Sequence, residues 1–453
     1  MSEQANGELR RVLKGFDVLA LGFGAMIGWG WIVLAGGWVL DAGSLGAVSA
    51  FFFGGIAMLL IGLIYAELAS AMPQVGGEHV YSHKALGDVG SFVCTWAIVF
   101  GYASVVAFEA VALPTVVEYL APNYKVGFLW TIAGGEVYAT WVAVGVAGAL
   151  SMTLVNCIGV RTAALLQKLV ILLIFAAGFM FFTGSLFTGS GATMEPLFTE
   201  GVNGVFLVLI MVPFMFVGFD VIPQAAEEIN LPFRRIGWLI IFSVSMAVLW
   251  YMLIVLGLSR VLTSAEIASA ELGVPEAMNA IFGGAWAGNL MILAGVAGIL
   301  TSWNAFLVGG SRAVYALARS GMLPKFLGRL HPRYNTPVNA ILLIGGASAL
   351  APLLGRESLV WFVNAGGLGI VIAYSMVALS FLVLRRRFPE MHRPWKLPMG
   401  ESFGGAALIL SLGIMVLYFP GSPAALLWPQ EWLLFAVWMV SGFALFGFTR
   451  LAY

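Results

Sequence analysis

Residues 205–228 read VFLVLIMVPFMFVGFDVIPQAAEE, an apolar run that contains Pro213, Gly218 and Pro223. Each proline removes a backbone donor and clashes with the preceding turn, so a continuous helix is not expected here. Residues 21–31, LGFGAMIGWGW, place four glycines within nine positions. Each of those glycines weakens a helix by roughly 1 kcal/mol relative to alanine. We therefore predict two apolar helices that are interrupted near their middle.

The composition of the chain excludes a soluble globular protein. Its 453 residues are 61% hydrophobic and only 10% charged, whereas a soluble domain carries roughly 25% charged residues. The lipid bilayer is therefore the expected surroundings. The 22 basic and 22 acidic residues cancel, which gives no reason to expect a nucleic-acid partner. The two cysteines and four scattered histidines lack the spacing of metal ligands, so no metal site is expected.

Apolar segments long enough to cross a bilayer recur along the chain. A hydrocarbon core of roughly 30 Å requires about 20 apolar residues per helix, and a helix satisfies its own backbone hydrogen bonds in lipid. We predict an all-α membrane protein with twelve transmembrane helices. Their expected ranges are 16–40, 45–72, 91–120, 138–157, 162–187, 204–229, 236–262, 286–316, 336–355, 359–384, 403–419 and 431–449.

The distribution of Lys and Arg assigns the two sides of the membrane. Of the 22 basic residues, all but Lys125, Arg260 and Arg356 fall on one side of this twelve-span arrangement. Basic segments stay in the cytoplasm, so both termini are expected there, in a plasma (bacterial inner) membrane. The expected parts are a cytoplasmic tail at 1–15, a transport core of helices 1–10 at 16–385, and peripheral helices 11–12 with the C-terminus at 386–453.

The two interrupted helices are the first and the sixth, five helices apart. Many secondary carriers consist of two five-helix halves related by an inverted repeat, and the first helix of each half is broken near the bilayer midplane. The freed N–H groups then bind a carboxylate, and the freed carbonyls bind a cation or an ammonium group. Glycine and proline also mark simple packing contacts in membrane helices. Their occurrence in both helices favours a carrier.

Three stretches resemble signatures of the amino acid–polyamine–organocation transporter superfamily. They are YAELASAMPQVGGEHVY at 65–81, GFDVIPQAAEEINLPFRR at 218–235 and SRAVYALARSGMLP at 311–324. The resemblance covers helices 1–10, and the last two helices match by topology only. It implies a LeuT-like fold of ten core helices in a 5+5 inverted repeat plus two peripheral helices. It also implies alternating access and small substrates that are amino acids, polyamines or related amines.

The resemblance further implies where such a substrate binds. In these families the loop that interrupts helix 1 holds the substrate carboxylate, and carbonyls of both broken helices receive its amine. Aromatic residues at the broken sixth helix cover the site. The substrate-binding residues implied by motif position are Ala25, Met26, Ile27, Gly28, Trp29, Gly30, Phe214, Phe216, Val217 and Phe219.

The chain departs from the family pattern at two positions. Trp29 stands between the two glycines of the helix 1 loop, where the family commonly has a small residue. Three roles stay open for this indole: lining the site, gating it, or facing lipid. Ile174 stands near the point in helix 5 where proton-coupled relatives often carry a lysine. The coupling ion is therefore expected to be either Na⁺ or H⁺, with no cofactor beyond it.

Glu109 lies deep in the third span, within YASVVAFEAVALP at 102–114. A charged side chain at a helix centre costs at least roughly 2.5 kcal/mol, so a specific reason for it is expected. Tyr102 and Glu109 share one helix face, and both are assigned to the substrate site. Glu109 is expected to pair with a cationic group of the substrate or to carry a proton. The alternative is a structural hydrogen bond to a neighbouring helix.

Other polar residues near the two breaks have paired interpretations. Asp220 is expected to gate or hold the unwound part of helix 6, or to cap its second half. Thr301 and Ser302, in a polar patch of helix 8 with Asn304, are candidate ion-coupling residues. Their alternative is a hydrogen bond back to the preceding turn.

Three glutamates lie near the cytoplasmic helix ends. Glu67, Glu227 and Glu228 are expected to pair with loop arginines such as Arg234 and Arg235. His79 and His83 are expected in the loop after the second helix and receive no assigned role.

The leading functional hypothesis is an ion-coupled symporter of amino acids or closely related amines. An exchanger of one amine for another is a close alternative that the sequence does not separate from it. A membrane-embedded enzyme would need a convergent catalytic set, and none is visible, so no enzyme is expected. A channel would need a filter-like loop or charged rings, and a sensor that shares the fold would bind without transporting.

Overall fold

The computed structural model describes residues 13–159 and 164–452. Most of the predicted tail at 1–15, together with Arg10, Arg11 and Arg161, lies outside the described residues, as does the side chain of Lys168. The described chain is almost entirely helical. Its α-helices are α1 (Gly15–Met26), α2 (Gly30–Val33), α3 (Ala35–Ala42), α4 (Ser44–Ala71), α5 (Glu78–Leu120), α6 (Ala139–Ile158), α7 (Ala164–Thr188), α8 (Val202–Leu209), α9 (Val212–Phe216), α10 (Val221–Gln224), α11 (Phe233–Val261), α12 (Ser264–Ser269), α13 (Gly273–Phe282), α14 (Ala285–Arg319), α15 (Val338–Ala349), α16 (Ser358–Arg387), α17 (Gly400–Leu417) and α18 (Gln430–Ala452).

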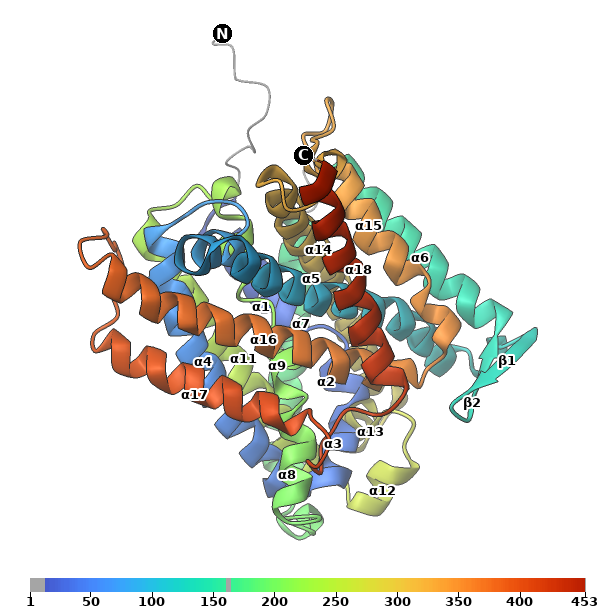
Figure 1. The fold of residues 1–453 in the computed structure, drawn as a ribbon. Coiled ribbons are helices and arrows are strands. Elements are labelled where there is room, and N and C mark those ends of the chain that lie inside the picture. The colour runs from blue at the N-terminus through green and yellow to red at the C-terminus, as the bar shows by residue number, and fades with distance from the viewer. Residues whose placement is uncertain (1–12, 160–163, 453) are drawn as a thin grey trace.

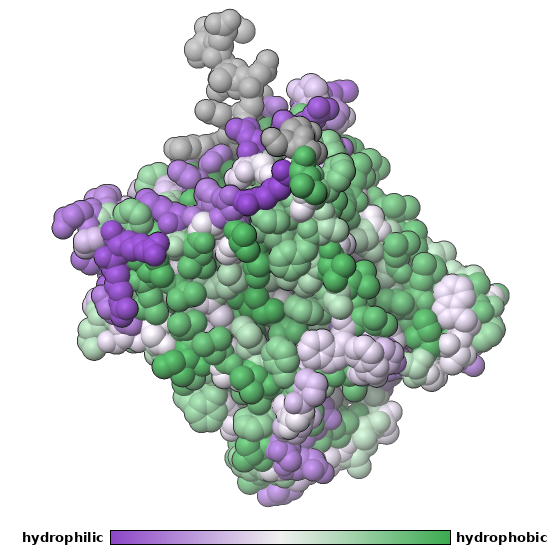
Figure 2. Space-filling model, in the orientation of Figure 1, coloured by the Kyte–Doolittle hydropathy of each residue, from purple (hydrophilic) through white to green (hydrophobic). Residues whose placement is uncertain are grey.

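Ten helices within residues 13–159 and 164–452 are long and apolar enough to cross a membrane, which confirms the prediction of an all-α membrane protein. The predicted sixth span is divided among α8, α9 and α10. The predicted ninth span is a shorter apolar helix at Val338–Leu354. Figure 2 shows hydrophobic side chains over the middle of the visible face and hydrophilic ones at its two ends. This distribution fits a bundle that sits in a bilayer.

Long helices pack against one another around the interrupted ones. α16 packs along α5, and α11 packs along α4. Figure 1 shows α17 beside α16 and α18 running across the same face of the bundle. Trp96 of α5 and Trp438 of α18 each donate their indole N–H to the other's backbone carbonyl, at 2.9 and 3.2 Å. The outer helix α18 is thus anchored to the core.

The predicted third span, 91–120, agrees with the long segment of α5 that follows Gly87. A shorter helical segment that was not predicted begins at Glu78, and Gly87, with φ 74°, forms the kink between the two. This φ favours glycine, because a side chain there would be strained. His79 and His83 therefore lie on a helix and not in a loop.

A β-hairpin follows α5, where a plain loop is implied by the sequence. Strand β1 (Phe128–Ile132) pairs antiparallel with β2 (Gly135–Tyr138). The two connecting residues, Ala133 and Gly134, have positive φ values of 49° and 85°. Two-residue hairpin turns of this kind match the twist of paired strands.

The glutamates near the basic end of the bundle find arginines other than the predicted ones. Glu67, 1% exposed, lies 2.9 Å from Arg393 Nε and receives a 3.0 Å hydrogen bond from Arg385 Nε. Glu228 pairs with Arg312 at 2.9 Å. The predicted partners Arg234 and Arg235 are exposed in the first turn of α11 and form none of these ion pairs. Glu227 instead accepts the Val75 N–H at 3.1 Å.

Candidate functional site

The interruption of the first helix is where the glycine pattern predicts it. α1 ends at Met26 and α2 begins at Gly30, so Ile27, Gly28 and Trp29 lie outside helices. Ile27 takes φ −107° and ψ 66°, a conformation that does not continue a helix. All three residues are buried. The backbone groups of this segment are therefore freed inside the bundle, where water does not satisfy them.

The sixth helix is interrupted at the predicted place as well. α9 ends at Phe216, Val217 is extended at φ −59° and ψ 138°, and α10 begins at Val221. Gly218 takes φ 139°, a conformation that residues with a Cβ rarely adopt. Pro213 stands at the beginning of α9, where its missing N–H has no helical partner to lose.

Glycines let the two breaks touch. A Cβ on Gly218 would lie 2.7 Å from Ala25 Cβ and 3.0 Å from the Met26 backbone nitrogen. A Cβ on Gly30 would lie 2.8 Å from Met215 Sδ. The residues predicted from the two distant sequence stretches are therefore brought into direct contact.

Helix α14 closes the first break from the opposite side. A Cβ on Gly298 would lie 2.6 Å from the Gly28 carbonyl oxygen and 2.7 Å from that of Ile27. A Cβ on Gly295 would lie 2.2 Å from the Trp29 ring. The Trp29 indole therefore packs onto the bare backbone of α14. With 0% of its surface exposed, Trp29 does not face lipid, so that alternative is wrong.

The Glu109 carboxyl group points at the first break. Its Oε1 lies 2.3 Å from the position that a Cβ on Gly28 would occupy. The Ser302 hydroxyl and the Trp29 backbone N–H lie where they donate hydrogen bonds to this carboxyl group. Its Oε2 has no hydrogen-bond partner in the described part of the chain, although Glu109 is only 1% exposed. An unpartnered buried carboxylate oxygen is costly unless a donor comes to it.

The last carbonyls of α1 are partly satisfied by neighbouring helices. The Tyr251 hydroxyl of α11 donates to the Met26 carbonyl at 2.7 Å. The Thr301 hydroxyl lies 3.1 Å from the Gly24 carbonyl, and also 3.2 and 3.0 Å from those of Ala297 and Gly298 in its own helix. The Thr301 hydroxyl therefore contacts both helix 1 and the preceding turn of its own helix. Tyr251 was missed in the sequence because nothing in its apolar span points to α1.

The aromatic residues of the sixth helix do not converge on one point. Phe214 packs edge-on against Phe108 of α5, with ring centroids 5.7 Å apart. Phe216 packs with Phe51 and Tyr251. Phe219, on the other side of the break, packs between tyrosines of α4 and α16. Among these three, Phe214 packs on the helix that carries Glu109.

Asp220 holds the unwound segment in place. Its Oδ1 accepts the Gly218 N–H at 2.7 Å, and its Oδ2 accepts the Tyr374 hydroxyl of α16 at 3.2 Å. Its side chain does not cap α10, although Asp220 directly precedes that helix. The Tyr102 hydroxyl lies near Asp220 rather than near Glu109. Tyr102 and Glu109 lie on the same helix, but Tyr102 lies near the sixth-helix break and Glu109 lies beside the first break.

Valine in place of Thr301 keeps the side-chain volume and removes the hydroxyl group. Because the Gly24 carbonyl then loses its donor from α14, we expect the free energy of unfolding to fall by about 1 kcal/mol. The measurement is the melting temperature of the purified protein in detergent. Ser441→Ala is the matched control, since that exposed hydroxyl bonds only within its own helix. Stabilisation by sodium that disappears in Thr301→Val would instead make this hydroxyl an ion ligand.

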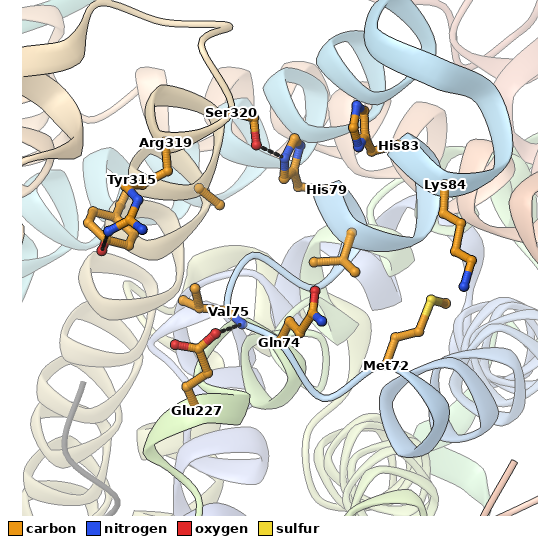
Figure 3. A pocket seen from close by; sticks show the side chains of 12 residues that line it. Met72, Gln74, Val75, His79, His83, Lys84, Glu227, Tyr315, Arg319 and Ser320 are labelled. Atoms are coloured by element: carbon orange, nitrogen blue, oxygen red, sulfur yellow. Dashed lines mark hydrogen bonds between the residues drawn. The ribbon is translucent and has the colours of Figure 1, made fainter. Parts of the chain in front are cut away.

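A polar cavity of about 570 Å³ opens at the end of the bundle that carries most of the basic residues. Its lining includes Val75, His79, Lys84, Glu227 and Arg319. Figure 3 shows hydrogen bonds between His79 and Ser320 and between Glu227 and Val75 at this cavity. None of the predicted substrate-binding residues lines it.

Comparison with known proteins gives a consistent result. Residues 13–443 match the family described as amino acid permease. The chain is similar to a branched-chain amino acid permease of Bacillus subtilis, at 27% identity over 90% of this chain and 88% of that protein. It is also similar to a methylthioribose transporter of the same organism, at 24% identity over 97% and 94%. Its identity to cationic amino acid transporter 4 of Mus musculus is 29%, over 83% of this chain and 60% of that protein.

Proposed function

Since the chain belongs to the amino acid permease family, we propose that it moves its amino acid by alternating access, as an ion-coupled symporter. The family is part of the amino acid–polyamine–organocation superfamily, and its members are transporters rather than enzymes. The chain is thus a multi-pass membrane protein that transports amino acids. Exchange of one amine for another is the alternative mode. Uptake into vesicles that contain no internal amine separates the two modes, because an exchanger has nothing to release.

The proposed architecture is the LeuT-like 5+5 inverted repeat with two peripheral helices, crossing the membrane twelve times. It is supported by the two breaks, which lie in the first and the sixth predicted spans and touch each other through Gly218. The proposed transport core is 16–385, and 386–453 forms the periphery. Both termini are proposed to lie in the cytoplasm of a plasma (bacterial inner) membrane, since the basic residues gather on their side.

The proposed substrate site lies beside Gly28, where the first break, α5 and α14 meet. One observation carries it: Glu109 Oε2 is buried without a partner among the described residues, beside backbone that the break has freed from its helix. The ammonium group or a side-chain cation of the substrate would supply the missing donor. Backbone N–H groups of the loop would receive the substrate carboxylate, as at other interrupted helices.

The relatives suggest three substrate classes to compare. Their names refer to branched-chain amino acids, cationic amino acids and methylthioribose. We propose an amino acid or closely related amine, with cationic ones favoured by the Glu109 carboxylate. Trp29 and Phe214 would border the bound molecule. Asp220 would hold the unwound backbone of helix 6 through the Gly218 N–H and act as a gate.

A thermal-shift screen tests this function directly. Purified protein is heated with L-arginine, L-lysine, L-leucine, L-isoleucine or methylthioribose, each with and without sodium chloride. A ligand present at about one hundred times its dissociation constant stabilises the native state by roughly 2.7 kcal/mol. We expect stabilisation by at least one amino acid and none by methylthioribose.

The screen is paired with uptake of the same radiolabelled compounds into proteoliposomes. Saturable uptake of a stabilising amino acid supports transport, and binding without uptake would instead indicate a sensor. Stabilisation by methylthioribose alone would contradict the proposed substrate class.

A further inference from the structure

Two carboxylates outside the proposed substrate site are buried together beside the sixth-helix break. Glu78 begins α5 directly after a glycine turn, and Asp220 precedes α10. Both side chains are 0% exposed. A Cβ on Gly77 would lie 3.3 Å from Pro223 Cβ, so this turn is pressed against α10. The close approach places Glu78 next to α10, the second half of the broken helix.

Every hydrogen bond to these carboxylates comes from a neutral donor. Tyr65 donates its hydroxyl to Glu78 Oε1 at 2.9 Å, and the Gln224 amide of α10 donates to Glu78 Oε2. Asp220 receives the Gly218 N–H and the Tyr374 hydroxyl. Neither carboxylate takes part in an ion pair within residues 13–159 and 164–452.

The groups that surround the pair supply no positive charge. The two carboxylates are connected through packed aromatic donors, since Tyr65, which bonds to Glu78, and Tyr374, which bonds to Asp220, have ring centroids 5.8 Å apart. The other titratable groups that face them from α4, α5 and α16 are all neutral in their ordinary state. They are Tyr65, Tyr81, Cys94, Tyr102 and Tyr374.

Unused hydrogen-bonding capacity points into the same place. Gln224 Oε1 has no hydrogen-bond partner in residues 13–159 and 164–452, and Gln224 is 0% exposed. The Tyr102 hydroxyl lies near Asp220 but makes no hydrogen bond of ordinary geometry. A buried oxygen acceptor and a free hydroxyl beside two carboxylates form a site with room for one more hydrogen-bond donor.

The free-energy cost of burying two carboxylate charges favours the binding of a positively charged species at this site. Isolated anions in a low-dielectric interior are strongly unfavourable, and two carboxylates that share a site keep a proton between them. A proton supplies a donor, removes one charge and needs no additional space.

The polar cavity provides a route for the proton. Its lining contains His79, which follows Glu78 in the chain, and Glu227, which lies three residues after Gln224. The two ring nitrogens of His79 bond to the hydroxyls of Ser320 at 2.6 Å and Ser91 at 2.8 Å. Figure 3 shows His79 and Glu227 on opposite sides of the segment that contains Val75. The cavity therefore extends to the residue next to Glu78 and to the residue three places after Gln224, which bonds to Glu78.

We propose that Glu78 and Asp220 jointly bind one proton, exchanged with water of the polar cavity, and that this proton is the coupling ion of transport. The proton moves from water to a carboxylate oxygen, and no other bond is made or broken. Glu78 is bonded to α10 and Asp220 to the backbone of the break, so gain or loss of the proton changes what holds the second half of helix 6. The coupling role rests on the proposed symport function, whereas the proton site itself does not.

Infrared spectroscopy tests the proton site without any substrate. Wild-type protein near neutral pH should show the carbonyl band of a buried protonated carboxylic acid. The double variant E78Q/D220N should lose the part of that band that comes from the pair, and the control Glu401→Gln, an exposed carboxylate at the same end of the bundle, should keep the wild-type intensity. An unchanged band in the double variant, or no band in the wild type, overturns the proposal. If the double variant fails to fold, Tyr65→Phe removes one donor to Glu78, and the band must then shift.

Transport tests the coupling. A pH difference of about one unit corresponds to roughly tenfold accumulation per coupled proton. In proteoliposomes, uptake of L-arginine or L-leucine by the wild type should follow such a gradient, and uptake by E78Q should not exceed equilibration. Uptake that follows the gradient equally in E78Q, or that follows a sodium gradient instead, overturns the coupling role. If the wild type takes up neither amino acid while the infrared band behaves as stated, the proposed function fails and the proton site stands.

Discussion

Glutamine in place of Glu109 is expected to abolish transport of a cationic amino acid while the protein remains folded. The substitution preserves side-chain shape and keeps an oxygen for the Ser302 hydroxyl, but it removes the group beside Gly28 that can become negatively charged when a cationic substrate binds. A hydrogen bond to a charged group contributes roughly 1.5–3 kcal/mol, so kcat/KM should fall about 100-fold. The measurement is the initial rate of L-arginine uptake into proteoliposomes.

Two further readings make the Glu109 result decisive. The melting temperature of Glu109→Gln should equal or exceed that of the wild type, because a costly buried charge has been removed. Glu136→Gln, in the exposed β-hairpin, is the control and should leave uptake unchanged. Unaltered uptake by Glu109→Gln would remove this residue from the mechanism and leave it a structural role.

Alanine in place of Gly298 should damage both stability and transport. The new Cβ would lie 2.6 and 2.7 Å from the Gly28 and Ile27 carbonyl oxygens, which are backbone atoms and cannot rotate away. Overpacking of this kind typically costs 1–3 kcal/mol. The first break must shift as well, so uptake should fall by more than about tenfold, since small misplacements of binding groups are expensive.

Gly413→Ala in α17 is the matched control, because a Cβ there meets nothing within 4 Å. In that helix interior alanine should raise the free energy of unfolding, by up to about 1 kcal/mol. Melting temperature and uptake are measured for both variants. Equal behaviour of the two would mean that the contact between α14 and the first break has no role in stability or transport.

The two breaks were predictable because their cause is local. Glycine and proline act on the backbone of their own helix, so the sequence alone indicates where Ile27–Trp29 and Val217–Asp220 leave the helix. The direction of Trp29 was not predictable. It depends on Gly295, which lies far along the chain and meets the Trp29 ring only when the bundle has folded.

Partners that lie far apart in sequence account for most of the remaining differences. Glu67 was correctly expected to meet arginine, but its partner Arg385 lies 318 residues away, and charge pattern does not fix such a pairing. Glu78 was overlooked because it follows two glycines and was assigned to a loop. A glutamate between two glycines and the apolar run of α5 was the available signal, and only the fold shows that it is buried.

The contacts of Glu67 with Arg385, Arg393 and Leu397 have a consequence for where this chain can be truncated. Arg393 and the Leu397 N–H both reach Glu67 from beyond α16, the latter at 2.7 Å. A truncation after residue 385 would delete both and leave the buried Glu67 carboxylate of α4 with Arg385 as the one partner that remains of these three. Chimeras that graft the proposed transport core onto another carrier should therefore retain the chain through at least Leu397.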